Sequence, residues 1–194
     1  IIVFCLVTIK VSAIEKVILF GDSLMAGYGL PNEQHLSVVL QKSLEFDGHN
    51  IEIINGSVSG STSAGGLNIA EWTLSENNID LMILCLGAND MLRGINPKET
   101  KNNLEEIIQI AKNKNIKVII AGMIAPTSYG FAYKKSFDKI FSDLSKKHKL
   151  QLIPFLLEGV AQNPKFNLSD GMHPNDQGTI IIGNTLKKAI LENL

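Results

Sequence analysis

The sequence predicts a doubly wound α/β domain, in which helices cover both faces of a parallel sheet. Two observations lead to this prediction: five short runs are almost wholly apolar, and stretches with helical periodicity separate them. Buried parallel strands are apolar on both faces, and each needs a crossover, usually a helix, to reach the next. At 194 residues, 45% apolar and 19% charged, the chain has the size and composition of one globular domain.

Strands and helices are expected to alternate along most of the chain. The expected strands cover residues 17–20, 51–54, 81–86, 118–122 and 150–153. The expected helices lie near residues 34–46, 64–76, 97–113 and 133–148, with a last one from 175 to about 192. In the third of these helices, Leu104, Ile107 and Ile108 recur at helical spacing. That helix should begin with Asn96 as its cap and Pro97 in its first turn.

The first residues of the chain differ from the rest. Residues 1–9 are continuously apolar and are followed by Lys10 and the small residues of 11–13. Such a run is too short to span a bilayer, but it matches the apolar core and cleavage site of a secretory signal. We therefore expect residues 1–13 to be a signal peptide, truncated because it lacks an initiator Met and a basic start. Residues 14–194 should form a single domain. An N-terminal strand or a disordered tail is the alternative.

Charge and cysteine content narrow the functional classes. The formal net charge is −1, and no cluster of Lys and Arg is dense enough for a nucleic-acid surface. Cys5 lies in the expected signal, so Cys85 alone would remain and no intrachain disulfide could form. Cys85 sits inside an apolar run, which predicts a buried thiol. Metal-ligand spacing, a phosphate loop and a dinucleotide fingerprint are all absent from the sequence, so we expect neither metal nor cofactor.

Polar and small residues follow the predicted strands where each one ends. The first strand runs into Gly21-Asp22-Ser23, the second into residues 55–60 (NGSVSG) and the third into residues 87–90 (GAND). In open parallel sheets a ligand binds beyond the carboxyl ends of the strands, so these exits should meet at one edge. The sequence therefore predicts a functional site there, although Gly21-Asp22-Ser23 alone would also serve as an ordinary turn.

The residue types at that edge suit cleavage of an acyl bond. Ser23 offers a hydroxyl, and His173 follows Asp170 in a glycine-containing turn, where the carboxylate can orient the imidazole. Gly60 can bring a backbone N–H close to a substrate oxygen, and Asn89 can donate from its amide. Each segment also has an ordinary interpretation, since loop 170–173 could cap a helix and residues 89–90 could cap a turn. The other histidines are expected to be solvated: His35, His49 and His148.

Four blocks of the sequence resemble one known family in their order. They are Gly21-Asp-Ser-Leu24, Gly60, Gly87-Ala-Asn-Asp90 and Asp170-Gly-Met-His-Pro-Asn175. This set is similar to that of the GDSL, or SGNH, hydrolase superfamily. Stretches 54–67, 86–97 and 153–161 resemble its bacterial thioesterase I, lysophospholipase L1 and arylesterase branch, and the resemblance covers the chain from residue 17 onward. The closest variation is Ala88, where some members carry a second glycine, and its methyl group would narrow the site slightly.

The resemblance implies a fold, a reaction and a role for each motif residue. The implied fold is a three-layer αβα sandwich with a five-stranded parallel sheet in flavodoxin-like order. The implied enzyme is a serine esterase that forms an acyl-enzyme on Ser23, with His173 as general acid/base and Asp170 as its orienting carboxylate. The backbone N–H groups of Ser23 and Gly60 and the side chain of Asn89 would bind the oxyanion.

The expected partner is a small-molecule acyl ester or thioester. Small and apolar residues should line the site, which suits an acyl chain or aryl ester better than a sugar: Ala88, Met91, Leu92, Ile124, Pro126, Phe131 and Met172. Residues 127–131 are expected to form a mobile wall of this site. Asp22 is expected to act as a local structural acceptor. The choice among thioester, lysophospholipid and aryl ester stays open.

Two other functions also stay open: a carbohydrate O-acetylesterase of the same superfamily, and a non-catalytic binding module on a hydrolase fold. An aromatic-rich sugar platform is absent from the sequence, which counts against the first, and every triad and oxyanion residue is present, which counts against the second. We expect a monomer that is periplasmic or secreted in a bacterium. After signal cleavage it should have no stable membrane anchor.

Overall fold

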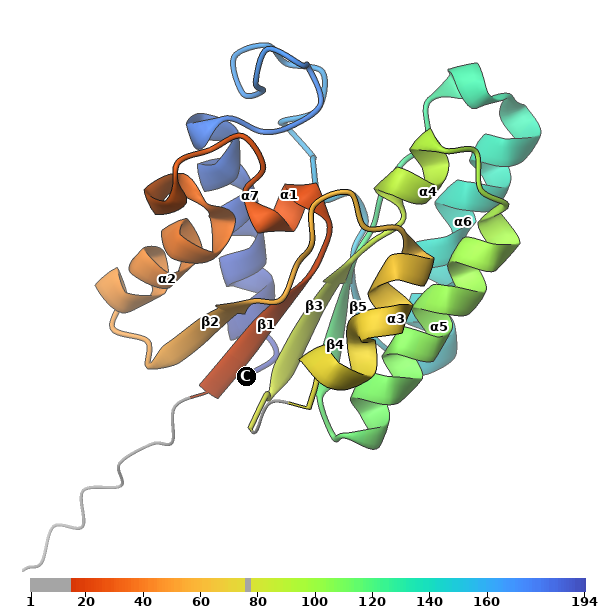
Figure 1. The fold of residues 1–194 in the computed structure, drawn as a ribbon. Coiled ribbons are helices and arrows are strands. Elements are labelled where there is room, and N and C mark those ends of the chain that lie inside the picture. The colour runs from red at the N-terminus through yellow and green to blue at the C-terminus, as the bar shows by residue number, and fades with distance from the viewer. Residues whose placement is uncertain (1–14, 76–77) are drawn as a thin grey trace, which may run out of the picture.

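The computed structural model describes residues 15–75 and 78–194, which form a sheet of five strands between two layers of helices (Figure 1). The expected signal peptide, residues 1–13, lies outside the described residues. The sheet and its two helical layers confirm the predicted three-layer αβα architecture.

All strand pairs are parallel, and the spatial order is β2-β1-β3-β4-β5, the flavodoxin-like order. The strands are β1 (Glu15–Gly21), β2 (Ile51–Asn55), β3 (Leu81–Cys85), β4 (Lys117–Ala121) and β5 (Gln151–Ile153). The central positions of β1, β3 and β4 are almost completely buried, as the apolar runs predict, whereas the edge strands β2 and β5 are only partly buried. The direction of the sheet order reverses between β1 and β3, so the crevice of the sheet opens where those two strands end.

Two helices cover one face of the sheet and three cover the other (Figure 1). The first layer pairs α2 (Leu36–Phe46) with α7 (Asp176–Leu191), and the second consists of α3 (Ser63–Thr73), α5 (Pro97–Asn113) and α6 (Phe131–His148). The bounds of α5 are those predicted, because the sequence carries a recognisable helix start at Asn96 and Pro97. The Asn96 side chain accepts a hydrogen bond from Lys98 N at 3.0 Å, and Pro97 occupies the first turn.

Two short helices were not predicted, α1 (Ser23–Ala26) and α4 (Ala88–Leu92), and both begin directly after a strand. They are too short to show the periodic spacing of apolar residues that marks a helix, so local hydrogen bonds determine where they form. Two 3₁₀ turns, η1 (Asn32–Gln34) and η2 (Thr127–Tyr129), precede α2 and α6. The predicted wall 127–131 is therefore η2 followed by Gly130 and the first residue of α6.

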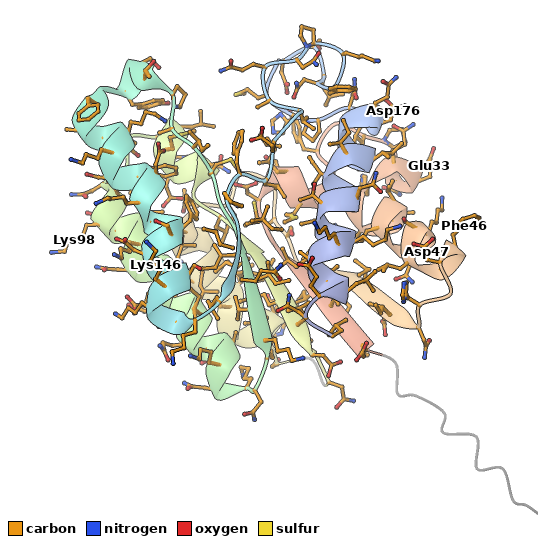
Figure 2. The ribbon with its side chains drawn as sticks, turned by 180° about the vertical axis from the view of Figure 1, so that it is seen from behind. Glu33, Phe46, Asp47, Lys98, Lys146 and Asp176 are labelled. Carbon is orange, nitrogen blue, oxygen red and sulfur yellow. The ribbon has the colours of Figure 1, made fainter. Side chains whose placement is uncertain are left out.

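Figure 2 shows the side chains of the protein from the opposite side of the molecule. Asp176 and Glu33 lie at the end of the molecule where α7 begins, whereas Phe46 and Asp47 lie at the other end of α2.

One prediction about the histidines was wrong: His148 is not solvated, because α5 and α6 pack side by side. Its side chain is 6% exposed, and its Nε2 lies 2.9 Å from Glu105 Oε1. Cys85 is buried as predicted, and this burial raises the pKa of its thiol well above the usual value.

Candidate active site

The site residues come from four chain segments that meet beyond the carboxyl ends of the strands. Ser23 follows β1, Gly60 lies in the loop after β2, and Asn89 lies in α4 after β3. Asp170 and His173 lie in the loop that leads into α7. The structure thus confirms that these exits converge, because Ser23, Gly60, Asn89 and His173 all line one cavity.

Ser23 is placed by a sharp turn between β1 and α1. Residue 21, the last of β1, is glycine because the neighbouring strand approaches closely: a Cβ at this position would lie 2.6 Å from the backbone oxygen of Cys85 on β3. Asp22 then caps α1, and its Oδ1 accepts a hydrogen bond from Leu24 N at 3.1 Å. Ser23 is consequently the first residue of a helix, with a side chain that is partly exposed to the cavity.

The loop that carries the histidine is held by its own backbone hydrogen bonds. Leu168 N donates to His173 O at 2.7 Å, and Asn175 N donates to Phe166 O at 2.9 Å, so the segment folds back on itself. Asn175 then caps α7, where its Oδ1 accepts from Gly178 N at 3.1 Å. The loop does cap a helix, as its ordinary interpretation suggested, and the same geometry also presents the histidine to the cavity.

Asp170 contacts His173 twice and the preceding residue once. Its Oδ1 accepts hydrogen bonds from Met172 N at 2.9 Å and from His173 N at 3.0 Å, and its Oδ2 lies 2.6 Å from His173 Nδ1. The backbone N–H of His173, followed by the N–H of Met172 and the imidazole, lowers the pKa of Asp170 to about 2 against the cost of desolvation. Asp170 is therefore a carboxylate at any pH near neutral, and it fixes Nδ1 as the protonated ring nitrogen.

The other ring nitrogen faces the serine. His173 Nε2 lies 2.9 Å from Ser23 Oγ, which completes a hydrogen-bonded chain from Asp170 through the imidazole to the hydroxyl. The ring of Tyr28 packs on the imidazole, with centroids 4.5 Å apart and planes tilted by 40°. The residues joined here are 150 positions apart in the sequence, and nothing but the fold brings them together.

Three potential hydrogen-bond donors belong to residues that line the same cavity as the Ser23 hydroxyl. Among the described residues, no acceptor is found for the backbone N–H of Ser23 or of Gly60, and the third donor is Asn89 Nδ2. Gly60 has φ +79°, and a Cβ there would meet no atom within 4 Å, so open space lies beside its backbone. Arg93 Nη2 donates to Gly60 O at 2.9 Å and thereby ties this loop to the end of α4.

The geometry agrees with comparisons with known proteins. A family model, the GDSL-like Lipase/Acylhydrolase family, matches residues 19–179. The chain belongs to this family. As a GDSL-family member it is an ester-hydrolysing serine hydrolase, which the resemblance of its four sequence blocks had implied.

Relatives of this GDSL-family chain match along most of their length. It is 35% identical to an arylesterase of Vibrio mimicus, covering 98% of this chain and 95% of the relative. It is 30% identical to the thioesterase 1/protease 1/lysophospholipase L1 of Escherichia coli K12, covering 95% and 88%. A crystal structure of TesA superimposes with a TM-score of 0.87 at 32% identity, covering 93% of this chain and all of that one.

The cavity beside Ser23 in this GDSL-family chain has a volume of about 600 Å³ and a mainly apolar lining. Six of the predicted lining residues contribute to it: Ala88, Met91, Leu92, Ile124, Pro126 and Met172. Phe131 was predicted wrongly, because it begins α6 with its side chain 81% exposed and does not line the cavity. Other lining residues were missed: Leu24, Tyr28, Met123, Phe155, Leu157 and Ala161. Three of these, Phe155, Leu157 and Ala161, lie in the segment that follows β5, where the sequence predicted no lining residue before Met172.

Two buried carboxyl groups, Asp22 and Asp90, support the segments that carry the donors. Asp22 Oδ2 accepts a hydrogen bond from Asn89 Nδ2 at 3.3 Å. Asp90 is completely buried and accepts from Ser63 N at 2.7 Å, Ser63 Oγ at 2.5 Å and Thr100 Oγ1 at 3.1 Å. Asp90 therefore joins α3, α4 and α5, which is more than the turn cap that its position suggested. No sequence spacing signals these contacts, because the partners are far apart in the chain.

Among residues 15–75 and 78–194, no group of three or more His, Cys, Asp or Glu side chains is placed to hold a metal ion. Within the same ranges, no helix is both long and apolar enough to cross a membrane.

Proposed function

We propose that the chain hydrolyses carboxylic esters or thioesters through an acyl-enzyme on Ser23, with His173 as general acid/base and Asp170 as its orienting carboxylate. The observation that supports this is the hydrogen-bonded chain that ends at Ser23 Oγ, 2.9 Å from His173 Nε2, on the wall of an apolar cavity. Nucleophile, base and orienting group are the three parts that serine catalysis needs.

The first half-reaction transfers the acyl group to Ser23. Its Oγ attacks the carbonyl carbon while His173 Nε2 takes the hydroxyl proton, and the electron pair of the carbonyl moves to its oxygen. The N–H groups of Ser23 and Gly60 and the amide of Asn89 donate hydrogen bonds to this oxyanion. As the tetrahedral intermediate collapses, the bond to the leaving group breaks, and the imidazolium gives its proton to the departing alcohol or thiol.

The second half-reaction releases the acid. Water attacks the acyl carbon while His173 Nε2 takes one of its protons, and the same three donors hold the second oxyanion. Collapse breaks the bond to Ser23 Oγ, which takes the proton back from the imidazolium. Asp170 accepts from Nδ1 throughout and stabilises the imidazolium in both half-reactions, and its low pKa keeps it charged while it does so.

An apolar acyl group is the substrate part that this cavity suits best. Its lining supplies methionine, leucine and other apolar side chains, which favour burial of an alkyl or aryl group over a sugar. Relatives are named arylesterase and thioesterase 1/protease 1/lysophospholipase L1, and both names describe acyl substrates. We therefore place carbohydrate O-acetylesterase activity second. A series of C2 to C12 acyl groups, as oxygen esters and as acyl-CoA, measured beside acetylated xylan, separates these possibilities.

The decisive experiment replaces the nucleophile. Ser23→Ala and His173→Ala should abolish hydrolysis of short p-nitrophenyl esters, with unchanged circular dichroism, because each removes one end of the hydrogen-bonded pair. Ser142→Ala is the matched control, since Ser142 lies on α6 and its hydroxyl only donates to Lys139 O. Full activity of Ser23→Ala would refute the proposed mechanism. A phosphonate inhibitor should add its mass to the peptide that contains Ser23 in the wild type and not in Ser23→Ala.

A further inference from the structure

We propose that Asp22 is a positioning residue of the oxyanion hole: its carboxylate selects the orientation of the Asn89 amide in which Nδ2, and not Oδ1, faces the substrate oxygen. This inference rests on the proposed function, because it concerns the donor set of that reaction. It assigns Asp22 a second task besides capping α1.

Both carboxylate oxygens of Asp22 are engaged by donors. Oδ1 accepts from Leu24 N at 3.1 Å, and Oδ2 accepts from Asn89 Nδ2 at 3.3 Å. The side chain is 0% exposed, so water cannot take the place of either donor. A carboxylate can only accept, whereas an amide side chain offers an NH₂ on one side and an oxygen on the other. The carboxylate therefore accommodates only one of the two orientations of Asn89.

The selected orientation is the one that catalysis requires. An amide nitrogen has two hydrogens, so Nδ2 can donate one to Asp22 and keep the other for the oxyanion. A half-turn of the amide would put Oδ1 in that place, next to a developing negative charge. The two orientations differ little in shape, so packing alone discriminates poorly between them. The hydrogen bond to Asp22 supplies the discrimination before substrate binds, which is the preorganisation that an oxyanion hole depends on.

Protonation of Asp22 should undo this selection. Burial raises the pKa of Asp22 to about 6, although hydrogen bonds from Leu24 N and Asn89 and the nearby His173 oppose the shift and Asp90 adds to it. The thiol of Cys85 on β3 also faces this carboxyl group. A protonated Asp22 presents a donor to Asn89 and favours the half-turned amide. Below about pH 6 the enzyme should therefore lose activity through protonation of Asp22.

The first test is Asp22→Asn. Asparagine is a good helix cap, so its oxygen can still accept from Leu24 N while its NH₂ faces Asn89, as in the protonated acid. We expect kcat to fall by about 10²–10³-fold with little change in KM, the usual effect of losing one oxyanion donor. The fold should persist, which circular dichroism checks. An Asp22→Asn enzyme that keeps more than half of the wild-type kcat would overturn the inference.

The second test asks whether Asp22 acts through Asn89. Asn89→Ala should itself cost about 10²–10³-fold in kcat. In the double variant, Asp22→Asn should add less than about threefold, because the amide that it turns is gone. Independent effects would instead multiply to about 10⁴-fold or more, and that result would mean that Asp22 acts by another route.

The third test needs no change at Asp22. In the wild type, protonation of Asp22 should steepen the acid limb of kcat/KM by up to about tenfold per pH unit. In Asn89→Ala this additional slope should be absent, because the amide that Asp22 orients is gone. Asp143→Asn, a change at an exposed carboxylate that pairs with Lys101, should keep the steep limb. Equal slopes in the wild type and Asn89→Ala would overturn the inference even if Asp22→Asn did not fold. Activity of Ser23→Ala, by contrast, would refute the proposed function itself.

Discussion

Removal of the Asp90 carboxyl group should destabilise the protein more than any surface change. Asp90→Ala leaves three buried donors without their acceptor, namely Ser63 N, Ser63 Oγ and Thr100 Oγ1. Each unsatisfied buried donor costs about 1–3 kcal/mol, and the hydroxyls can turn toward other acceptors, so the total should be on the order of 4 kcal/mol. At about 2–4 °C per kcal/mol for a chain of this size, the melting temperature should fall by about 10 °C.

Chemical and thermal unfolding followed by far-UV circular dichroism measure this loss. Trp72 fluorescence is unsuitable, because its side chain is already 81% exposed in the folded protein. Asp143→Ala is the control: that carboxylate is exposed and pairs with Lys101 at 2.9 Å, so its loss should cost no more than about 1 kcal/mol. The loss of stability in Asp90→Asn should lie between those of Asp90→Ala and Asp143→Ala, because its amide oxygen can still accept a hydrogen bond from Ser63 N.

The same change should also reach the active site. Asp90 holds the start of α3, directly after the Gly60 loop, to α4, which carries Asn89. We therefore expect Asp90→Ala to lose at least about tenfold in kcat at a temperature where it is folded, since small displacements of catalytic groups are costly. If the free energy of unfolding of Asp90→Ala lay within about 1 kcal/mol of the wild-type value, the hydrogen bonds of Asp90 would not be what holds α3, α4 and α5 together.

Two further changes test the support of the catalytic groups. Arg93→Ala removes the hydrogen bond to the carbonyl of Gly60, so kcat should fall about fivefold to tenfold with little loss of stability. Arg93→Lys should recover part of the lost kcat. Unchanged steady-state kinetics in Arg93→Ala would argue against a role of this hydrogen bond in positioning the Gly60 loop. Asp170→Asn places a donor where His173 Nδ1 now donates, so kcat should fall by about 10²–10⁴-fold at every pH. Because Asp170 has a pKa of about 2, it stays charged down to that pH, and the acid limb of the wild type near pH 6 should not report its protonation.

Much of the fold could be predicted because its signals are local. The apolar runs gave the five strands, and the Asn96-Pro97 pair gave the start of α5. The short helices α1 and α4 could not be predicted, since each is little more than one turn and depends on how the chain leaves a strand. His148 was misjudged for a similar reason: its burial comes from α5, 43 positions away at Glu105.

The candidate site also contains residues that the sequence could predict and residues that it could not. Ser23, Asp170 and His173 stand in short motifs, and the rule about strand exits placed them at one edge. The supporting contacts are of another kind: Asp90 meets Ser63 across 27 positions, and Arg93 meets Gly60 across 33. No periodicity or spacing marks such pairs, because they depend on which helices become neighbours. Sequence reasoning therefore predicted the groups of the proposed reaction and missed the residues that hold their segments in place.

The order of the proposed catalytic groups along the chain has a consequence for biosynthesis. Ser23 leaves the ribosome well before His173, which lies 150 positions later. A nascent polypeptide that stops before residue 173 lacks the imidazole that would take the proton of the proposed nucleophile. Ester turnover should therefore begin only after residue 173 has been made, and the onset of hydrolysis in a translation reaction would time the moment at which these two segments of the domain come together.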